Sequence, residues 1–347
     1  MQEVKQRITI LTSFLAIAAI AMLAAAIAAS KTAGIVLTMV VAYIVFAVFL
    51  IGFVYRIIRW AISPVPFRIP TTCGQEKSLP WIKANPLECP FGNLGVIGRM
   101  AGEIFLFRSL FRNSKAELVN GRPVYGSSKW LWFFGLMFHV SLLLVILRHL
   151  RFFTEPVVPF VGALSSLDGF LEIGIPTLYM TDTALVAGLI FLFMRRVLVP
   201  QLRYLSLFTD YFALLLIASV AVTGISMRHF FPVDLNEIKT MTMGWVTFTP
   251  VVPGKTGILF YMHLCFVMVL IAWLPFSKLM HMGGIFLSPT RNMANNNRAR
   301  RHVNPWNAPV RVRTYKEYEE EFREQMIEAG IPVESTGPGE AEKDKQD

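Results

Sequence analysis

Long apolar stretches separated by shorter polar segments dominate this chain of 347 residues. A helix needs about 20 mostly apolar residues to cross a bilayer, because each residue adds about 1.5 Å toward about 30 Å of hydrocarbon. The pattern therefore predicts an all-α integral membrane bundle of six transmembrane helices. Their expected ranges are Ile8–Ala29, Ile35–Val54, Trp130–Leu150, Thr183–Val199, Leu205–Met227 and Gly257–Pro275.

Basic residues gather in alternate loops between these spans. Residues 56–130 carry eleven Lys or Arg and four Glu, whereas residues 152–194 carry neither Lys nor Arg. By the positive-inside rule, both termini and the long loop are cytoplasmic, and the protein is a multi-pass protein of the cytoplasmic (inner) membrane. The net charge of +10 therefore reflects topology. Without a nucleic-acid-binding motif beside it, this charge predicts no nucleic-acid partner.

The same pattern divides the chain into four parts. Residues 1–55 hold two N-terminal transmembrane helices, 56–129 a cytoplasmic loop, 130–284 a four-helix core and 285–347 a cytoplasmic, partly disordered tail. In the loop, Val96–Arg112 alternates apolar and basic positions, which favours an interfacial amphipathic helix or a soluble helix packed on a partner. A short docking helix is expected around Tyr315–Glu328. The first span resembles a retained helix more than a cleaved signal peptide, since its apolar run is long.

Composition narrows the chemistry further. The chain is 54% hydrophobic and only 16% charged, where soluble domains carry about a quarter charged residues. Its three cysteines, Cys73, Cys89 and Cys265, are too few and too far apart for a disulfide framework or a cysteine-rich iron–sulfur or zinc site. We expect ordinary reduced thiols.

Histidines inside the apolar spans are the candidate chemistry, because ionisable residues in a membrane are costly and usually functional. His139 and His149 lie ten residues apart on the third expected span, which turns them by about 80° on one face. His263 and His281 lie eighteen apart, or five full turns, on the sixth, if that helix continues to Gly283–Gly284. His302 lies in the polar tail and is expected to be incidental.

Because the two helices are antiparallel, His139 is expected level with His281, and His149 level with His263. Each level then offers two imidazoles, which is how bundle helices hold a b-type haem. The sequence therefore predicts two haems b, with His139 and His281 on the inner iron and His149 and His263 on the outer. The helical rise is about 15 Å between His139 and His149 and about 27 Å between His263 and His281. Helix tilt and a kink at Pro275 are expected to absorb part of this difference.

A haem accepts one electron at a time, so a quinone near the outer haem is the natural two-electron partner. Arg148, Arg151, Arg228 and His229 gather at that level. They are candidates to orient a quinone or to pair with haem propionates, although anchoring of helix ends explains each arginine equally well. His229 is also an alternative to His149 or His263 as a haem ligand. The inner haem needs a partner subunit on the cytoplasmic side.

The spacings His139/His149 and His263/His281 resemble those of the cytochrome b (gamma) subunit family of respiratory nitrate reductases. The stretches FRIPTTCGQEKSLPWIKA (residues 67–84) and GRPVYGSSKWLWFFGLMFH (121–139), with the extra first helix, are similar to the DsrM family. Those proteins are the membrane cytochromes b of the sulfite-reduction-associated complex of sulfate-reducing microbes.

This resemblance implies two haems b and menaquinone as the membrane redox partner. It implies a cytoplasmic iron–sulfur subunit similar to heterodisulfide reductase, a periplasmic multihaem cytochrome c and a second quinone-interacting membrane subunit. The reaction served would be sulfate respiration. Three alternatives remain: a nitrate reductase gamma or heterodisulfide reductase type of cytochrome b, a haem-free membrane anchor, and a transporter, which the lack of paired broken helices disfavours.

Overall fold

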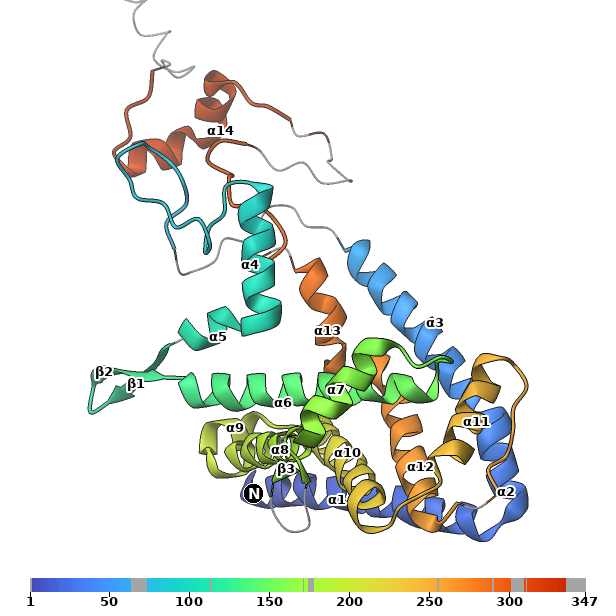
Figure 1. Cartoon of the computed structure of the whole chain (residues 1–347). Helices are drawn as coiled ribbons and strands as arrows, with labels where there is room; N and C mark the ends of the chain where they lie inside the picture. The colour runs from blue at the N-terminus through green and yellow to red at the C-terminus, as the bar shows by residue number, and fades with distance from the viewer. Residues whose placement is uncertain are drawn as a thin grey trace, which may run out of the picture. The chain divides into compact units, whose positions relative to one another are not determined.

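The computed structural model describes residues 2–63, 74–112, 114–170, 172–173, 178–254, 256–288, 290–300, 309 and 311–334. The chain forms two compact units, Met1–Arg301 and His302–Asp347. The structure is 71% helical (Figure 1). Cys73 and His302, which the sequence singled out, lie outside the described residues.

Five helical runs in the larger unit are long and apolar enough to cross a membrane, within the part of the chain that the structure describes. They confirm five of the predicted spans and a multi-pass membrane protein. The first is α1 (Gln2–Ala29), and the second joins α2 (Lys31–Val36), η1 (Leu37–Val41) and α3 (Ala42–Ala61). The others are α6 (Lys129–His149) with η2 (Leu150–Phe152), α10 (Phe208–Ile225) with η3 (Ser226–Phe230), and α12 (Ile258–Trp273) with η4 (Leu274–Phe276).

The expected fourth span, Thr183–Val199, forms the helix α8 (Met180–Leu198). It is 19 residues long, but it contains one aspartate and two arginines and is not among the five apolar runs. α8 packs against α6 and α10. A Cβ at Gly188 would lie 2.9 Å from the Cβ of Phe138, so this glycine lets α6 and α8 approach closely. The six-span count remains a prediction.

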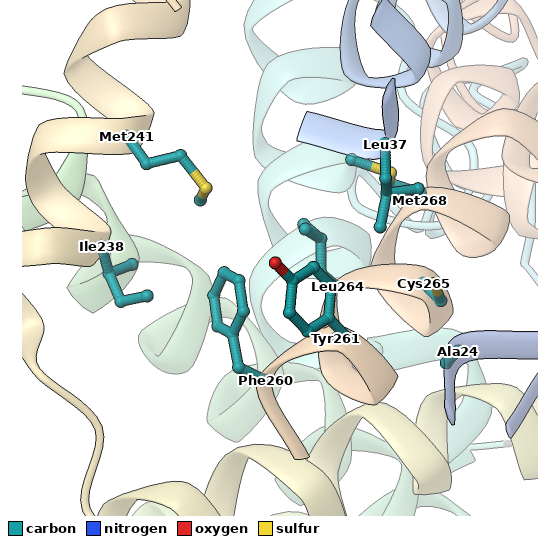
Figure 2. Close-up of a cluster of buried hydrophobic side chains, with 9 residues drawn as sticks. All are labelled: Ala24, Leu37, Ile238, Met241, Phe260, Tyr261, Leu264, Cys265 and Met268. Carbon is teal, nitrogen blue, oxygen red and sulfur yellow. The ribbon is translucent and has the colours of Figure 1, made fainter. Parts of the chain in front are cut away.

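Apolar side chains form the contacts between the spans. Figure 2 shows Phe260 and Tyr261 of α12 between the side chains of α11 (Leu235–Val246) and Leu37 of η1. This buried cluster consists of Ala24, Leu37, Ile238, Met241, Phe260, Tyr261, Leu264, Cys265 and Met268. Other apolar side chains face outward, such as Met22 and Ile51, which are 67% and 69% exposed. Lipid tails solvate such residues, so the outward apolar surface suits a membrane protein.

The sixth span breaks where the sequence predicted only a kink. α12 ends at Trp273, and η4, η5 (Lys278–Met280), α13 (His281–Gly284) and η6 (Ile285–Leu287) follow as short turns. The backbone at Ser277 is extended. The expected continuous helix to Gly283–Gly284 was therefore wrong, because Pro275 cannot donate an intrahelical hydrogen bond. His281 is placed by these turns and not by five turns of one helix.

The long loop contributes two helices to this unit. The predicted helix Val96–Arg112 is divided into α4 (Asn93–Leu106) and α5 (Arg108–Arg112) by Phe107, whose φ is 48°. Arg99 on α4 is 1% exposed and donates to the carbonyls of Arg291 and Met293. Burial lowers the pKa of its guanidinium from the ordinary value. These bonds fasten α4 to the segment that follows η6.

Two antiparallel hairpins depart from the all-α prediction. β1 (Ser114–Val119) pairs with β2 (Arg122–Ser127) through a turn at Asn120 and Gly121, whose φ angles of 51° and 77° suit a two-residue hairpin. β3 (Glu172–Ile173) pairs with β4 (Leu178–Tyr179). Two short helices complete this unit, α7 (Pro159–Phe170) and α9 (Pro200–Leu205).

The smaller unit contains the predicted helix in the tail, α14 (Tyr315–Glu328). Thr314 and Glu317 form a capping box at its start. The hydrogen bond from the Thr314 backbone holds the pKa of the Glu317 carboxyl below its ordinary value. Cys89 and Cys265 are both buried.

Candidate functional site

The structure brings the four candidate histidines together as two pairs. His139 of α6 and His281 of α13 have ring centroids 6.0 Å apart and an interplanar angle of 87°. We call these two residues the first pair. His149 of α6 and His263 of α12 lie near enough to interact electrostatically, and we call them the second pair. Each pair joins one histidine of α6 to one from the sixth span or the turns that follow it.

Three of the four rings form the same kind of hydrogen bond. Nδ1 of His139 lies 2.7 Å from the Gly135 carbonyl oxygen, and Nδ1 of His149 lies 2.7 Å from that of Val145. Nδ1 of His281 lies 3.0 Å from the carbonyl oxygen of Lys278. A carbonyl only accepts, so each Nδ1 donates its proton, and Nε2 retains a lone pair.

His263 reaches the same state through a side chain. Its Nδ1 lies 2.9 Å from Oγ1 of Thr223, and that hydroxyl donates to the Ser219 carbonyl at 2.7 Å. Because the hydroxyl proton is used in this way, Thr223 accepts from the Nδ1–H of His263. The neighbouring Gly224 is also close, since a Cβ there would lie 3.2 Å from Cε1 of the ring. In all four imidazoles Nδ1 is therefore engaged, and Nε2 is left with a lone pair.

The first pair lies beside a basic cavity of about 540 Å³. Its lining includes His281 and the cations Arg56, Lys278 and Arg291. Lys278 also donates to Asp210 at 2.8 Å. On the other side, Phe107 packs edge-on against His139, with ring centroids 5.0 Å apart. The break between α4 and α5 therefore reaches into the span at the level of the first pair.

The second pair lies beside a network of buried ion pairs. Arg148, 10% exposed, donates to Asp168 of α7 and, at 3.3 Å, to Oδ1 of Asp182 on α8. Nε2 of His229 lies 3.1 Å from Oδ2 of the same Asp182. With Nε2 engaged there, Nδ1 is the ring nitrogen of His229 that remains for another partner.

Tyr179 holds the remaining predicted residues of this network. The guanidinium carbons of Arg148 and Arg228 lie 4.9 and 5.0 Å from its ring centroid, and Arg228 donates to its hydroxyl. Arg151 donates to Oγ of Ser165 at 2.5 Å and to the Arg148 carbonyl at 3.1 Å. The sequence predicted that Arg148, Arg151, Arg228 and His229 would meet, and they do.

The sequence analysis missed three members of this network, Asp168, Asp182 and Tyr179. The signal that could have found the two aspartates is a carboxylate within or beside an apolar stretch, which is costly unless it is paired. Among the described residues, no group of three or more His, Cys, Asp or Glu is arranged to hold a metal ion. The candidate site is therefore two imidazole pairs, one of them beside an ion-pair network.

The helices and their buried polar groups are those of a multi-pass membrane protein. The family model of the nitrate reductase gamma subunit matches residues 124–297, and the chain belongs to that family. It is similar to the Hdr-like menaquinol oxidoreductase cytochrome b-like subunit of Archaeoglobus fulgidus, with 46% identity over 79% of this chain and 84% of the relative. The protein of the same name from Archaeoglobus profundus is 41% identical over 78% and 84%.

Proposed function

We propose that this protein is a dihaem cytochrome b subunit that passes electrons between menaquinol and a partner complex. One observation carries the proposal: two pairs of histidines, all with Nδ1 engaged and Nε2 available. Metal-bound histidines characteristically donate the other ring N–H to a carbonyl or a similar acceptor, which fixes the tautomer.

The first pair fits a haem on geometric grounds. Two imidazole nitrogens each about 2 Å from one metal ion, as metal–histidine bonds are, have ring centroids about 6 Å apart. The centroids of His139 and His281 are 6.0 Å apart. The macrocycle supplies the other four nitrogens, so two protein ligands are sufficient. Bound haem would supply one-electron redox chemistry, and His139 and His281 would hold its iron within the surrounding charge.

His149 and His263 are proposed to hold the second haem. Arg148, Arg151, Arg228 and His229 beside them are proposed to orient a quinol or to pair with propionates. The similar proteins from Archaeoglobus are described by name as cytochrome b-like subunits of a menaquinol oxidoreductase, which supports menaquinol as the substrate. Arginine suits a quinone carbonyl or a carboxylate because it offers several donors in one plane.

We infer that the protein works as part of a complex. The proposed topology is six spans with both termini cytoplasmic, so that the first pair faces the cytoplasm. The name of the relatives, "Hdr-like", supports an iron–sulfur partner similar to heterodisulfide reductase on that side. A periplasmic multihaem cytochrome c and a second quinone-interacting membrane subunit, as in the sulfite-reduction-associated complex, complete the proposed assembly. A nitrate reductase gamma subunit is the alternative within the family.

A haem count on the purified chain tests the proposal. The pyridine haemochrome assay is expected to give two haems b per chain. His149→Ala and His263→Ala should each lose the same haem. His139→Ala and His281→Ala should each lose the other. A redox titration of the haem that remains shows which one each variant has lost. His302→Ala is the matched control and should keep both.

The outcomes separate the candidate functions. No haem in the parent protein would overturn the proposal and favour a haem-free membrane anchor. If a variant of the first pair and a variant of the second pair lose the same haem, the proposed assignment of ligands to haems is wrong. The protein would then still be a cytochrome, but with other haem ligands.

A further inference from the structure

A carboxylate and an imidazole form a buried pair beside His149. Nε2 of His229 on η3 lies 3.1 Å from Oδ2 of Asp182 on α8, and their side chains are 9% and 10% exposed. Arg148 holds the other carboxylate oxygen at 3.3 Å, so Asp182 bridges the arginine and the imidazole. A carboxylate in this position fixes the tautomer and the orientation of the imidazole.

The nitrogen of His229 that remains is Nδ1. The carboxylate of Asp182 accepts, so Nε2 carries the proton and Nδ1 carries the lone pair. Within the described residues no hydrogen bond to this Nδ1 is found, and it is not among the buried unpaired polar atoms there. Nδ1 is therefore a base that a ligand hydroxyl can reach.

We propose that the Asp182–His229 pair is the proton acceptor for quinol oxidation at the end of the bundle that holds the second pair. This inference rests on the proposed function, which supplies the haems as electron acceptors. A hydroquinone O–H bond breaks, its proton passes to Nδ1 of His229, and one electron goes to a one-electron acceptor, the role that bound haem would supply. His229 releases the proton to water and accepts the second, while the second electron leaves in the same way. One quinol thus gives one quinone, two protons and two electrons.

The surrounding charges suit this step. His229 contacts Asp182 and Tyr179 directly. The charged network around these two residues is completed by Arg148, Arg151, Arg228 and Asp168. Three guanidiniums oppose two carboxylates, which leaves one positive charge in excess. That charge stabilises the negative charge that develops on a hydroquinone oxygen as its proton leaves. Arg228, which is exposed and adjacent to His229, is placed to donate to that oxygen.

Stopped-flow reduction of the haem-containing protein by a water-soluble naphthoquinol tests the pair, with His229→Gln and Asp182→Asn as variants. A positioned general base contributes about 100- to 10,000-fold, so His229→Gln should slow haem reduction at least about 100-fold at pH 7. Asp182→Asn should slow it about 10- to 100-fold, as loss of an orienting partner does. Glu155→Gln is the matched control, because it removes a carboxylate paired with Lys239, away from His229, and it should keep the parent rate.

Two further readouts separate a proton acceptor from a structural residue. In His229→Gln the rate should rise about tenfold per pH unit, because only the hydroquinone anion then reacts, whereas the parent rate should level off. The Kd of naphthoquinol for the dithionite-reduced protein, in which the haems accept no electron, should stay within about threefold of the parent, because a removed base alters the reaction more than the binding.

Each outcome is decisive. An unchanged rate in His229→Gln, or a slower rate with the parent pH slope, would overturn the role of the pair and leave the cytochrome standing. A parent protein that binds haem and is not reduced by naphthoquinol would instead overturn the proposed quinol chemistry. The rate of Asp182→Asn is interpreted only if this variant keeps both haems. If it loses a haem, His229→Gln decides, because that variant leaves the ion pairs of Arg148 in place.

Discussion

The residues around the first histidine pair differ in charge and burial from those around the second pair. Beside the first pair, Arg56, Lys278 and Arg291 line a basic cavity. Lys278 is 70% exposed. Beside the second pair, Arg148 is buried between Asp168 and Asp182, and the latter also holds His229. Both ends present two imidazoles, so the ligand sets alone do not explain the difference.

We relate this difference between the two pairs to whether a site must accept protons as well as electrons. An electron that leaves through a haem edge to a protein partner needs no acid or base, and exposed cations serve to attract that partner. A quinol releases two protons with its two electrons, so its site needs a group that accepts them. The end that holds the second pair has such a group in Asp182 and His229. We therefore propose that the quinol binds at that end.

Arg148→Leu is expected to have the largest effect on this comparison. Removing one partner of a buried ion pair leaves its carboxylates uncompensated, which typically costs about 3–5 kcal/mol. Thermal unfolding of the purified protein in detergent, followed by circular dichroism, measures the loss. Arg228→Leu is the control, since Arg228 is exposed, and should cost no more than about 1 kcal/mol. Equal losses in the two variants would contradict a buried network at this end.

Thr223→Val sharpens the comparison between the two pairs. The ring of His263 contacts a side-chain hydroxyl, that of Thr223, and this partner can be removed by substitution. Loss of such a second partner typically weakens metal binding about 10- to 100-fold. The rate of haem transfer to an apoglobin should rise for one of the two haems and stay constant for the other.

The control for this variant is Ser226→Ala, whose hydroxyl donates only to the Val222 carbonyl on the same helix. It should leave both haem transfer rates at the parent values. If Thr223→Val loosened both haems, or neither, the assignment of His263 to one separate haem site would fail.

Lys278→Gln is expected to have the smallest effect. Its ion pair with Asp210 is largely exposed on the lysine side, so stability should change by no more than about 1 kcal/mol. Oxidation of the reduced protein by the anion ferricyanide should slow a few-fold at low salt, because surface charge steers association. Glu155→Gln, at the other end, serves as the control.

Added salt checks the cause of that slowing. At 1 M salt the Debye length is about 3 Å, so parent and Lys278→Gln should react at the same rate. A difference that persists at high salt would mean that Lys278 acts through structure and not through charge.

Much of the fold follows from local pattern. Apolar runs of about 20 residues predicted five spans that the structure contains, because a bilayer imposes one length on every helix that crosses it. The capping box at Thr314 and Glu317 is likewise local, and α14 begins there as expected. The break after Trp273 was underestimated, since one proline indicates a disturbance without fixing the turns that follow.

The sequence by itself determined the membrane class and the candidate site residues, because charged groups and histidines are too costly to be scattered at random in apolar helices. Only the tertiary structure decided their partners. Asp168, Asp182 and Tyr179 come from three separate elements, and the side chain of Arg148 joins all three. Which of several cations pairs with a given carboxylate depends on helix rotation and close packing, as at Gly188 and Phe138, and those are set by contacts between distant segments.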